Sequence, residues 1–119
     1  GDKAAVVGEW ALVSWNEEAT DFNVYISFAA DGSFEIYQQV WSFDYELFTG
    51  SYTVAGDSLK GTYADGTKWA SEYKFAKSDN TLTLIDSVDV TSVYEKCTIP
   101  EEIITEATTT RSEEVVPFL

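Results

Sequence analysis

The sequence is poor in the residues on which metal and thiol chemistry depends. It contains no histidine and a single cysteine, Cys97. A lone cysteine cannot form a disulfide within the chain, and without histidine the usual zinc-binding spacings cannot be built. Histidine is also the usual general base and the partner of the nucleophile in catalytic triads. We therefore expect no disulfide, no metal, no cofactor and no enzymatic activity.

Positive charge is scarce as well. Seven basic residues stand against 21 acidic residues, which gives a formal net charge of -14 at pH 7. Such a chain repels a phosphate backbone or an anionic lipid surface, so the charge excludes nucleic-acid binding. The acidic residues are typical of a solvated surface. Those in the loops lack the D-x-[DN]-x-[DN]-G spacing that defines a calcium-binding loop.

Long apolar runs are also missing. No stretch of the sequence approaches the roughly 18 apolar residues that predict a membrane-spanning helix. No basic region followed by an apolar region stands at the start of the sequence. The first residues, Gly1-Asp2-Lys3, suggest a chain that begins just after a removed export segment, although the same letters are compatible with a cytosolic start.

What the sequence does contain is regular alternation of apolar and polar residues. Hydrophobic residues make up 45 % and aromatic residues 15 % of the 119 positions, which opposes disorder and suits one domain over residues 1–119. Runs with a period of two are separated by Gly, Asp and Asn turns about every 8 to 12 residues. This pattern predicts an antiparallel meander of eight strands between about residues 8 and 97.

The expected strands are residues 8–15, 22–29, 33–41, 45–55, 58–64, 67–76, 81–86 and 91–97. Eight antiparallel strands with short connections favour a closed up-and-down β-barrel. The fold class that we predict is therefore all-β. Two of the turns carry Asp31-Gly32 and Asp65-Gly66, where glycine supplies the positive φ that tight hairpins need.

The tail, residues 98–119, differs in kind from the strands. Thr98-Ile99-Pro100-Glu101 fits a capping box with proline in the first turn, which predicts a short helix through Ala107. The sequence then ends in the apolar run Val115-Val116-Pro117-Phe118-Leu119. We expect this run to dock on the barrel. The alternative is a flexible acidic linker whose apolar end waits for a partner.

Several motifs resemble those of a known family. They are Gly8-Glu9-Trp10 at the start of the first strand, Gly50-Ser51-Tyr52-Thr53-Val54, Tyr63-Ala64-Asp65-Gly66 before Trp69, and Thr81-Leu82-Thr83-Leu84 before Tyr94. Together they resemble the lipocalin-like, calycin-type domains of exported Bacteroidetes proteins. The resemblance covers residues 8–97 and implies an exported protein that is periplasmic, an outer-membrane lipoprotein or extracellular.

The same resemblance implies a role for the G-x-W motif. In lipocalins its tryptophan closes one end of the barrel beneath a basic side chain that follows the last strand, an arrangement that suits cation–π packing. This chain departs from the pattern, because its single arginine, Arg111, lies well into the tail. We assign barrel closure to Gly8, Trp10 and Arg111. Two alternatives stay open, namely Lys96 over Trp10, and a Trp10 that is simply a core residue.

The function that the resemblance implies is non-enzymatic binding or transport of a small, largely apolar molecule in the cell envelope or the extracellular space. Tyrosine and tryptophan suit such a pocket because their rings are apolar while their tips form hydrogen bonds. The expected ligand-binding residues are Phe34, Ile36, Tyr52, Tyr63, Trp69 and Tyr73. The alternative is a structural or protein-interaction module of the cell envelope whose barrel these side chains fill. The sequence identifies no protein partner.

The Asp-Gly turns lead to a first test. We expect Gly32→Val and Gly66→Val each to lower the free energy of unfolding by about 1 kcal/mol or more, because a β-branched residue resists positive φ. Denaturant titration of each variant measures this loss. Unchanged midpoints in both variants would show that these turns are misassigned.

Overall fold

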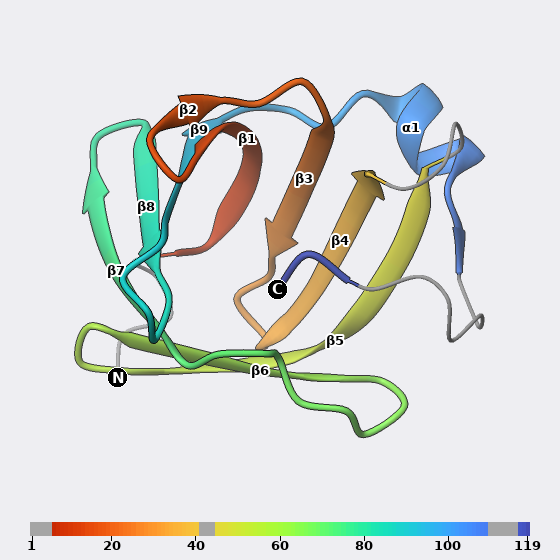
Figure 1. Ribbon diagram of the computed structural model, residues 1–119. Coiled ribbons are helices and arrows are strands. Elements are labelled where there is room, and N and C mark those ends of the chain that lie inside the picture. The colour runs from red at the N-terminus through yellow and green to blue at the C-terminus, as the bar shows by residue number, and fades with distance from the viewer. Residues whose placement is uncertain (1–5, 41–44, 110–116) are drawn as a thin grey trace.

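The chain folds into a closed antiparallel β-barrel, as the computed structural model of residues 6–40, 45–109 and 117–119 describes it (Figure 1). Its eight main strands are β1 (Gly8–Trp15), β3 (Asn23–Phe28), β4 (Ser33–Gln39), β5 (Glu46–Ala55), β6 (Ser58–Tyr63), β7 (Tyr73–Ser78), β8 (Thr81–Ile85) and β9 (Thr91–Lys96). Each pairs with the next, and β9 pairs with β1 to close the barrel. The predicted fold class is thus confirmed.

Two very short strands flank the barrel. β2 (Glu18–Ala19) pairs with the end of β1, and β10 (Thr108–Thr109) runs parallel to the start of β5. Within the described parts of the chain, no helix is long and apolar enough to cross a membrane.

The predicted glycine turns are present. Gly32 has a φ of 92° and Gly66 a φ of 94°. In each turn the preceding aspartate fixes the loop, since Asp31 Oδ1 accepts a hydrogen bond from the Ser33 N–H at 2.9 Å and Asp65 Oδ1 accepts one from the Thr67 N–H at 2.8 Å. The bond from Thr67 lowers the pKa of the Asp65 carboxyl below its usual value.

The predicted strand 67–76 is wrong in its first half. β7 begins only at Tyr73, and before it a single bridge links Lys68 to Thr62. The physical reason is the size of Trp69, which donates its main-chain N–H to Gly61 O at 3.0 Å while its indole lies over that glycine. Residues 70–72 therefore leave β6. Only the first two residues of β7, Tyr73 and Lys74, pair with β6.

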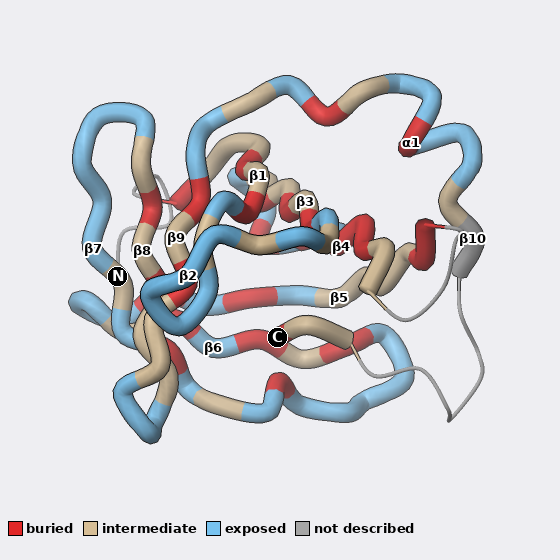
Figure 2. Tube along the Cα trace, turned by 45° about the horizontal axis from the view of Figure 1, so that its top comes forward, coloured by how far each residue is buried: buried red, intermediate tan, exposed pale blue. Residues whose placement is uncertain are grey.

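The core fills the inside of the barrel. Figure 2 shows buried positions alternating with less buried ones along β3, as expected for a strand with one face inward, and the same alternation begins β4 up to Ile36. Trp10 is fully buried at the start of β1, and its indole Nε1–H donates a hydrogen bond to Val6 O at 2.9 Å. A polar tip buried with its partner is the favourable way to place tryptophan in a core.

A second, smaller cluster lies outside the first. Helix α1 (Glu101–Glu106) places Ile103 against Tyr37 and Tyr45, and Ile99 joins them. Cys97 packs against the same cluster, and burial raises the pKa of its thiol, so the thiol stays protonated at neutral pH.

The predicted capping box is wrong, although the short helix exists. The N-cap residue is Pro100, which forms no side-chain cap hydrogen bond. The reason is that the chain before the helix is tied to β1. The Cys97 N–H donates to Glu9 O at 3.0 Å, and the Ile99 N–H donates to Glu9 Oε1 at 2.7 Å. Thr98 is therefore held in an extended segment, and the helix begins after Pro100.

The expected docking of the apolar tail is confirmed for its last residues. Leu119 is 2 % exposed and belongs to the main core, and Phe118 packs against that core. Val115 and Val116 lie outside the described residues, so the structure says nothing of their part in the docking.

The role of Trp10 in the core leads to a stability prediction. We expect Trp10→Phe to lower the free energy of unfolding by about 2 kcal/mol, because it removes buried volume and leaves Val6 O without the indole donor. Trp15→Phe is the matched control, since Trp15 is 45 % exposed. Equal losses in the two variants, measured by denaturant titration, would contradict the assignment of Trp10 to the core.

Candidate functional site

The structure brings the six predicted ligand-binding residues together inside the barrel. They come from β4, β5, β6, the loop before β7 and the first position of β7, and all six are buried in one cluster. They are Phe34, Ile36, Tyr52, Tyr63, Trp69 and Tyr73. At this level the rings are in contact, with centroid distances of 5.2 Å from Trp69 to Phe34 and 5.9 Å from Trp69 to Tyr73. The rings are therefore packed against one another at this level, and their role in ligand binding stays a prediction.

The tyrosine hydroxyls among these residues are neutral hydrogen-bond donors. Tyr52 donates to Ala29 O at 2.7 Å and Tyr63 donates to Leu119 O at 2.5 Å. Burial raises the pKa of Tyr63 far above the usual value and raises the pKa of Tyr73 to about 12, with the Asp86 charge adding to the shift in Tyr73. These groups can orient a polar atom, but they do not act as acids or bases near neutral pH.

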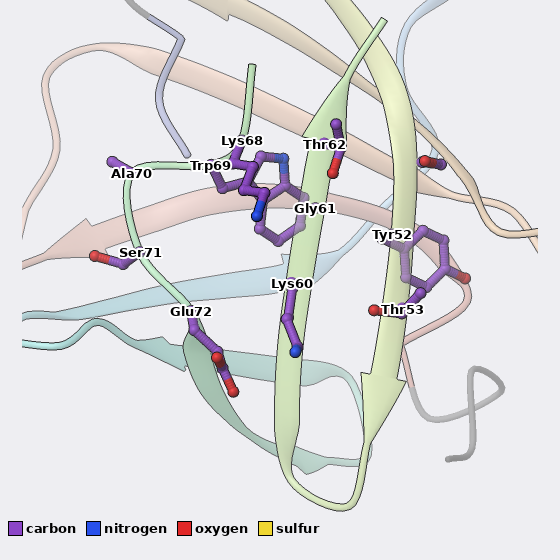
Figure 3. A pocket seen from close by; sticks show the side chains of 11 residues that line it. Tyr52, Thr53, Lys60, Gly61, Thr62, Lys68, Trp69, Ala70, Ser71 and Glu72 are labelled. Atoms are coloured by element: carbon purple, nitrogen blue, oxygen red, sulfur yellow. The ribbon is translucent and has the colours of Figure 1, made fainter. Parts of the chain in front are cut away.

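A pocket opens in the barrel wall beside this cluster. It lies between β6 and residues 70–72, where the two segments are not paired, and its volume is about 470 Å³. We call it the wall pocket. Figure 3 shows Lys60 on β6 and Glu72 on the opposite segment extending their side chains at the opening. The pocket exists because residues 70–72 do not pair with β6.

Trp69 forms the inner wall of this pocket. Its indole lies beside β6 at Gly61 (Figure 3), and a Cβ at Gly61 would be 2.0 Å from Trp69 Cε2. Among the described residues, Trp69 Nε1 is buried without a hydrogen-bond partner. The ring thus separates the pocket from the core at the cost of one unsatisfied donor.

The rim of the wall pocket carries positive charge. Lys60 and Lys68 both line it and both are exposed, in a chain with only seven basic residues. Thr53 and Ser71 add hydroxyl groups, and Glu72 adds a carboxylate. The arrangement offers an apolar ring on the inside and ammonium and hydroxyl groups on the outside.

Sequence reasoning missed both lysines and Gly61. The signal for Lys60 and Lys68 is weak, since nothing local distinguishes them from other surface lysines. Gly61 stands in a predicted strand without turn residues around it, which is itself a sign of close approach by another group.

The last described residues, Pro117–Leu119, pack against the core inside the barrel. The Phe118 N–H donates to Gln38 Oε1 at 2.7 Å, and the Phe118 ring lies 6.0 Å from that of Phe22. Gln38 is fully buried and sits on the same strand face as Phe34 and Ile36. Sequence reasoning missed Gln38 too, although the alternation from Phe34 places it on the inward face.

Of the three residues assigned to barrel closure, the structure describes two, Gly8 and Trp10, and they lie close together. A Cβ on Gly8, whose φ is 141°, would lie 3.7 Å from Trp10 Nε1 and 3.8 Å from Lys96 Cε. Lys96 is also the register partner of Trp10 across β1 and β9. Arg111 lies outside the described residues, so its assignment stays a prediction. Among the described residues, no group of three or more side chains is arranged to hold a metal ion.

The packing of Trp69 on Gly61 gives a further test. We expect Gly61→Ala to lower the free energy of unfolding by about 2 kcal/mol, because the new methyl group overlaps the indole. Lys60→Ala, one residue away and facing outward, is the matched control. A cycle with Trp69→Leu should show that the two losses are not additive. A neutral Gly61→Ala would contradict the observed packing.

The comparisons with known proteins agree with this architecture. A family model described as a lipocalin-like domain matches residues 6–84. The crystal structure of a lipocalin-like protein from Bacteroides uniformis is similar, with a TM-score of 0.63 and 19 % sequence identity over 78 % of this chain and 99 % of that chain. At this identity the likeness concerns the fold alone. A comparison with curated proteins gives no match. Since the family model spans more than half of the chain, this protein belongs to the lipocalin-like domain family.

Proposed function

We propose that the protein binds a small molecule with an apolar body and an anionic or polar end, and that the wall pocket is the binding site. Binding or transport, rather than catalysis, is then its role, in the cell envelope or outside the cell. The observation that carries the proposal is the break in pairing between β6 and β7, which leaves about 470 Å³ beside Trp69. Small-molecule sites span about 300–1,000 Å³ and combine apolar walls with few polar groups.

The lining defines the chemistry of the ligand. Its apolar part would rest against the indole of Trp69, and its charged or polar part would reach Lys60 and Lys68. The chain as a whole carries a net charge of -14, so these two lysines form a local exception to a repulsive field. Because they are exposed, their attraction is screened by salt. A molecule that is apolar throughout would leave this rim unused.

The alternative is a structural or protein-interaction module. One observation favours it, namely that the residues predicted to bind a ligand are buried together in one cluster in the barrel interior. In that case exposed apolar residues such as Trp15 and Val88, which are 45 % and 74 % exposed, would meet a partner. Saturable binding of a small probe at the wall pocket separates the two functions.

Anilinonaphthalene sulfonate is a suitable probe, because it joins an aromatic body to an anionic group and fluoresces when its body leaves water. We expect saturable binding to the full chain, and about tenfold weaker binding when Lys60→Glu and Lys68→Glu are combined. Exposed charge pairs contribute up to about 1 kcal/mol each, and 1.4 kcal/mol corresponds to a factor of about ten.

The matched control combines Lys74→Glu and Lys77→Glu, which change the net charge equally on exposed positions of β7. This variant should bind the probe nearly as the parent does. If the two double variants bind equally well, the lysines of the wall pocket do not recognise the anion. If the parent shows no saturable binding, the proposed function fails.

A further inference from the structure

Exposed apolar side chains gather at one end of the barrel. Among the described residues, the exposed large hydrophobic side chains are Val13, Trp15, Val88 and Ile104. Trp15 ends β1 and has Ser92, at the start of β9, as its register partner, while Val88 lies in the turn that leads into β9. The pairing of β1 with β9 therefore brings Val13, Trp15 and Val88 to the same end, and we call these three residues the end patch. None of them lines the wall pocket.

Hydrogen bonds fix both turns that carry the end patch. Asp86 Oδ1 accepts the Val88 N–H at 2.9 Å. The Asn16 N–H, directly after Trp15, donates to Thr91 O at 2.7 Å and so ties the turn after β1 to the start of β9. Because the main chain is held in place before any contact is made, little conformational entropy is lost when another molecule packs on these side chains.

The charges around the end patch all have one sign. In the two turns, residues 16–19 and 86–90, the charged side chains are Glu17, Glu18, Asp86 and Asp89, and neither turn contains a basic residue. Figure 2 shows the turn at β2 as exposed. An exposed apolar patch with a polar rim is typical of an interaction surface, and a rim of one sign selects a partner of the opposite sign.

This charge separates the molecules that could cover the end patch. A second copy of the chain, which carries the same net charge of -14, is repelled, and so is an anionic lipid surface. A basic protein segment is attracted, and its cationic side chains can also stack on the exposed ring of Trp15. Tryptophan is enriched among the residues that contribute most to protein interfaces. The apolar and acidic groups therefore favour the same kind of partner.

We propose that the end patch is a docking surface for a basic, apolar segment of another protein. Trp15 and Val88 contact the apolar side chains of that segment, and Glu17 and Asp89 attract its lysines or arginines. The inference does not rest on the proposed function. Docking on a protein and binding of a small molecule are compatible, since the end patch and the wall pocket use different residues.

Two synthetic peptides, titrated into the full chain by calorimetry, test the proposal. One is acetyl-Lys-Leu-Lys-Leu-Lys-Leu-Lys-amide, and the other has serine in place of each leucine. We expect the leucine peptide to bind about fivefold more tightly, because its apolar side chains leave water at the end patch. Combining Trp15→Ser with Val88→Ser should remove most of this difference. Ile104→Ser is the matched control and should keep it, because Ile104 is 42 % exposed but lies on helix α1.

Charge variants test the acidic rim. Glu17→Gln combined with Asp89→Asn should weaken binding of the leucine peptide about threefold more than Asp57→Asn combined with Asp79→Asn, since exposed charge pairs act mainly at short range. Both double variants remove two negative charges, and the control turns lie at the other end of the barrel. Asp79 and Asp89 both have positive φ, which asparagine tolerates.

Several outcomes overturn the proposal. They are a parent chain that binds neither peptide, a serine peptide that binds as tightly as the leucine peptide, and an Ile104→Ser variant that loses as much as the patch variant. Dimerisation of the parent, or its binding to phosphatidylcholine vesicles, that is lost in the patch variant would assign the end patch to a different occupant. Should the double variant fail to fold, as judged by its thermal melt, Val88→Ser alone replaces it, since Val88 is 74 % exposed.

Discussion

The antiparallel pairing of β1 with β9 is the contact on which the rest of the structure depends. It joins Trp10 to the register position of Lys96 and turns an open sheet into a barrel without edges. Closure also fixes the path of the chain after β9, because Glu9 on β1 holds the main chain of Cys97 and Ile99. The helix is thereby carried onto the outside of the barrel, where it packs on a separate cluster of apolar side chains. A barrel of eight strands has an interior just wide enough for side chains or for one small ligand.

In a closed barrel, free space depends on where neighbouring strands pair and where they do not. Inside the barrel, aromatic rings around Trp69 are already in contact, so they leave little room at that level. Space appears where the wall itself is interrupted, between β6 and residues 70–72. The glycine at position 61 and the tryptophan at position 69 are therefore linked features, since the ring can close the inner side of the gap only because the facing strand lacks a Cβ there.

Much of the barrel was predictable from local pattern. The alternation along strands such as Asn23–Phe28 and the Asp-Gly turns at Gly32 and Gly66 reflect short-range constraints, and the structure confirms them. The errors come from contacts between segments. Alternation continues through residues 67–72, but pairing there is lost to the packing of Trp69 on β6, which the alternation of neither segment reveals. Likewise, the hydrogen bond from the Ile99 N–H to the Glu9 carboxylate determines where the helix begins. No local sequence motif indicates this bond.

The interior residues could be predicted from the sequence, whereas the residues of the wall pocket could not. The six aromatic and aliphatic residues were placed correctly in the interior, since inward position follows from alternation. Whether they enclose a cavity or fill it depends on total volume, which no pattern of single residues conveys. Lys60 and Lys68 both line the wall pocket only because Lys68 and Trp69 lie against β6 before residues 70–72 leave it.

The wall pocket and the region around Leu119 differ in their electrostatics. The wall pocket relies on exposed ammonium groups, whose attraction for an anion is weakened by salt and opposed by the net charge of -14. The region around Leu119 uses a neutral carboxamide and a hydroxyl kept neutral by burial. Its hydrogen bonds are formed among apolar side chains, where water and ions compete less. Ionic strength should therefore act mainly on the binding of an anion at the wall pocket. The same barrel thus carries two kinds of polar contact, one made by exposed charges at its surface and one made by neutral groups among buried apolar side chains.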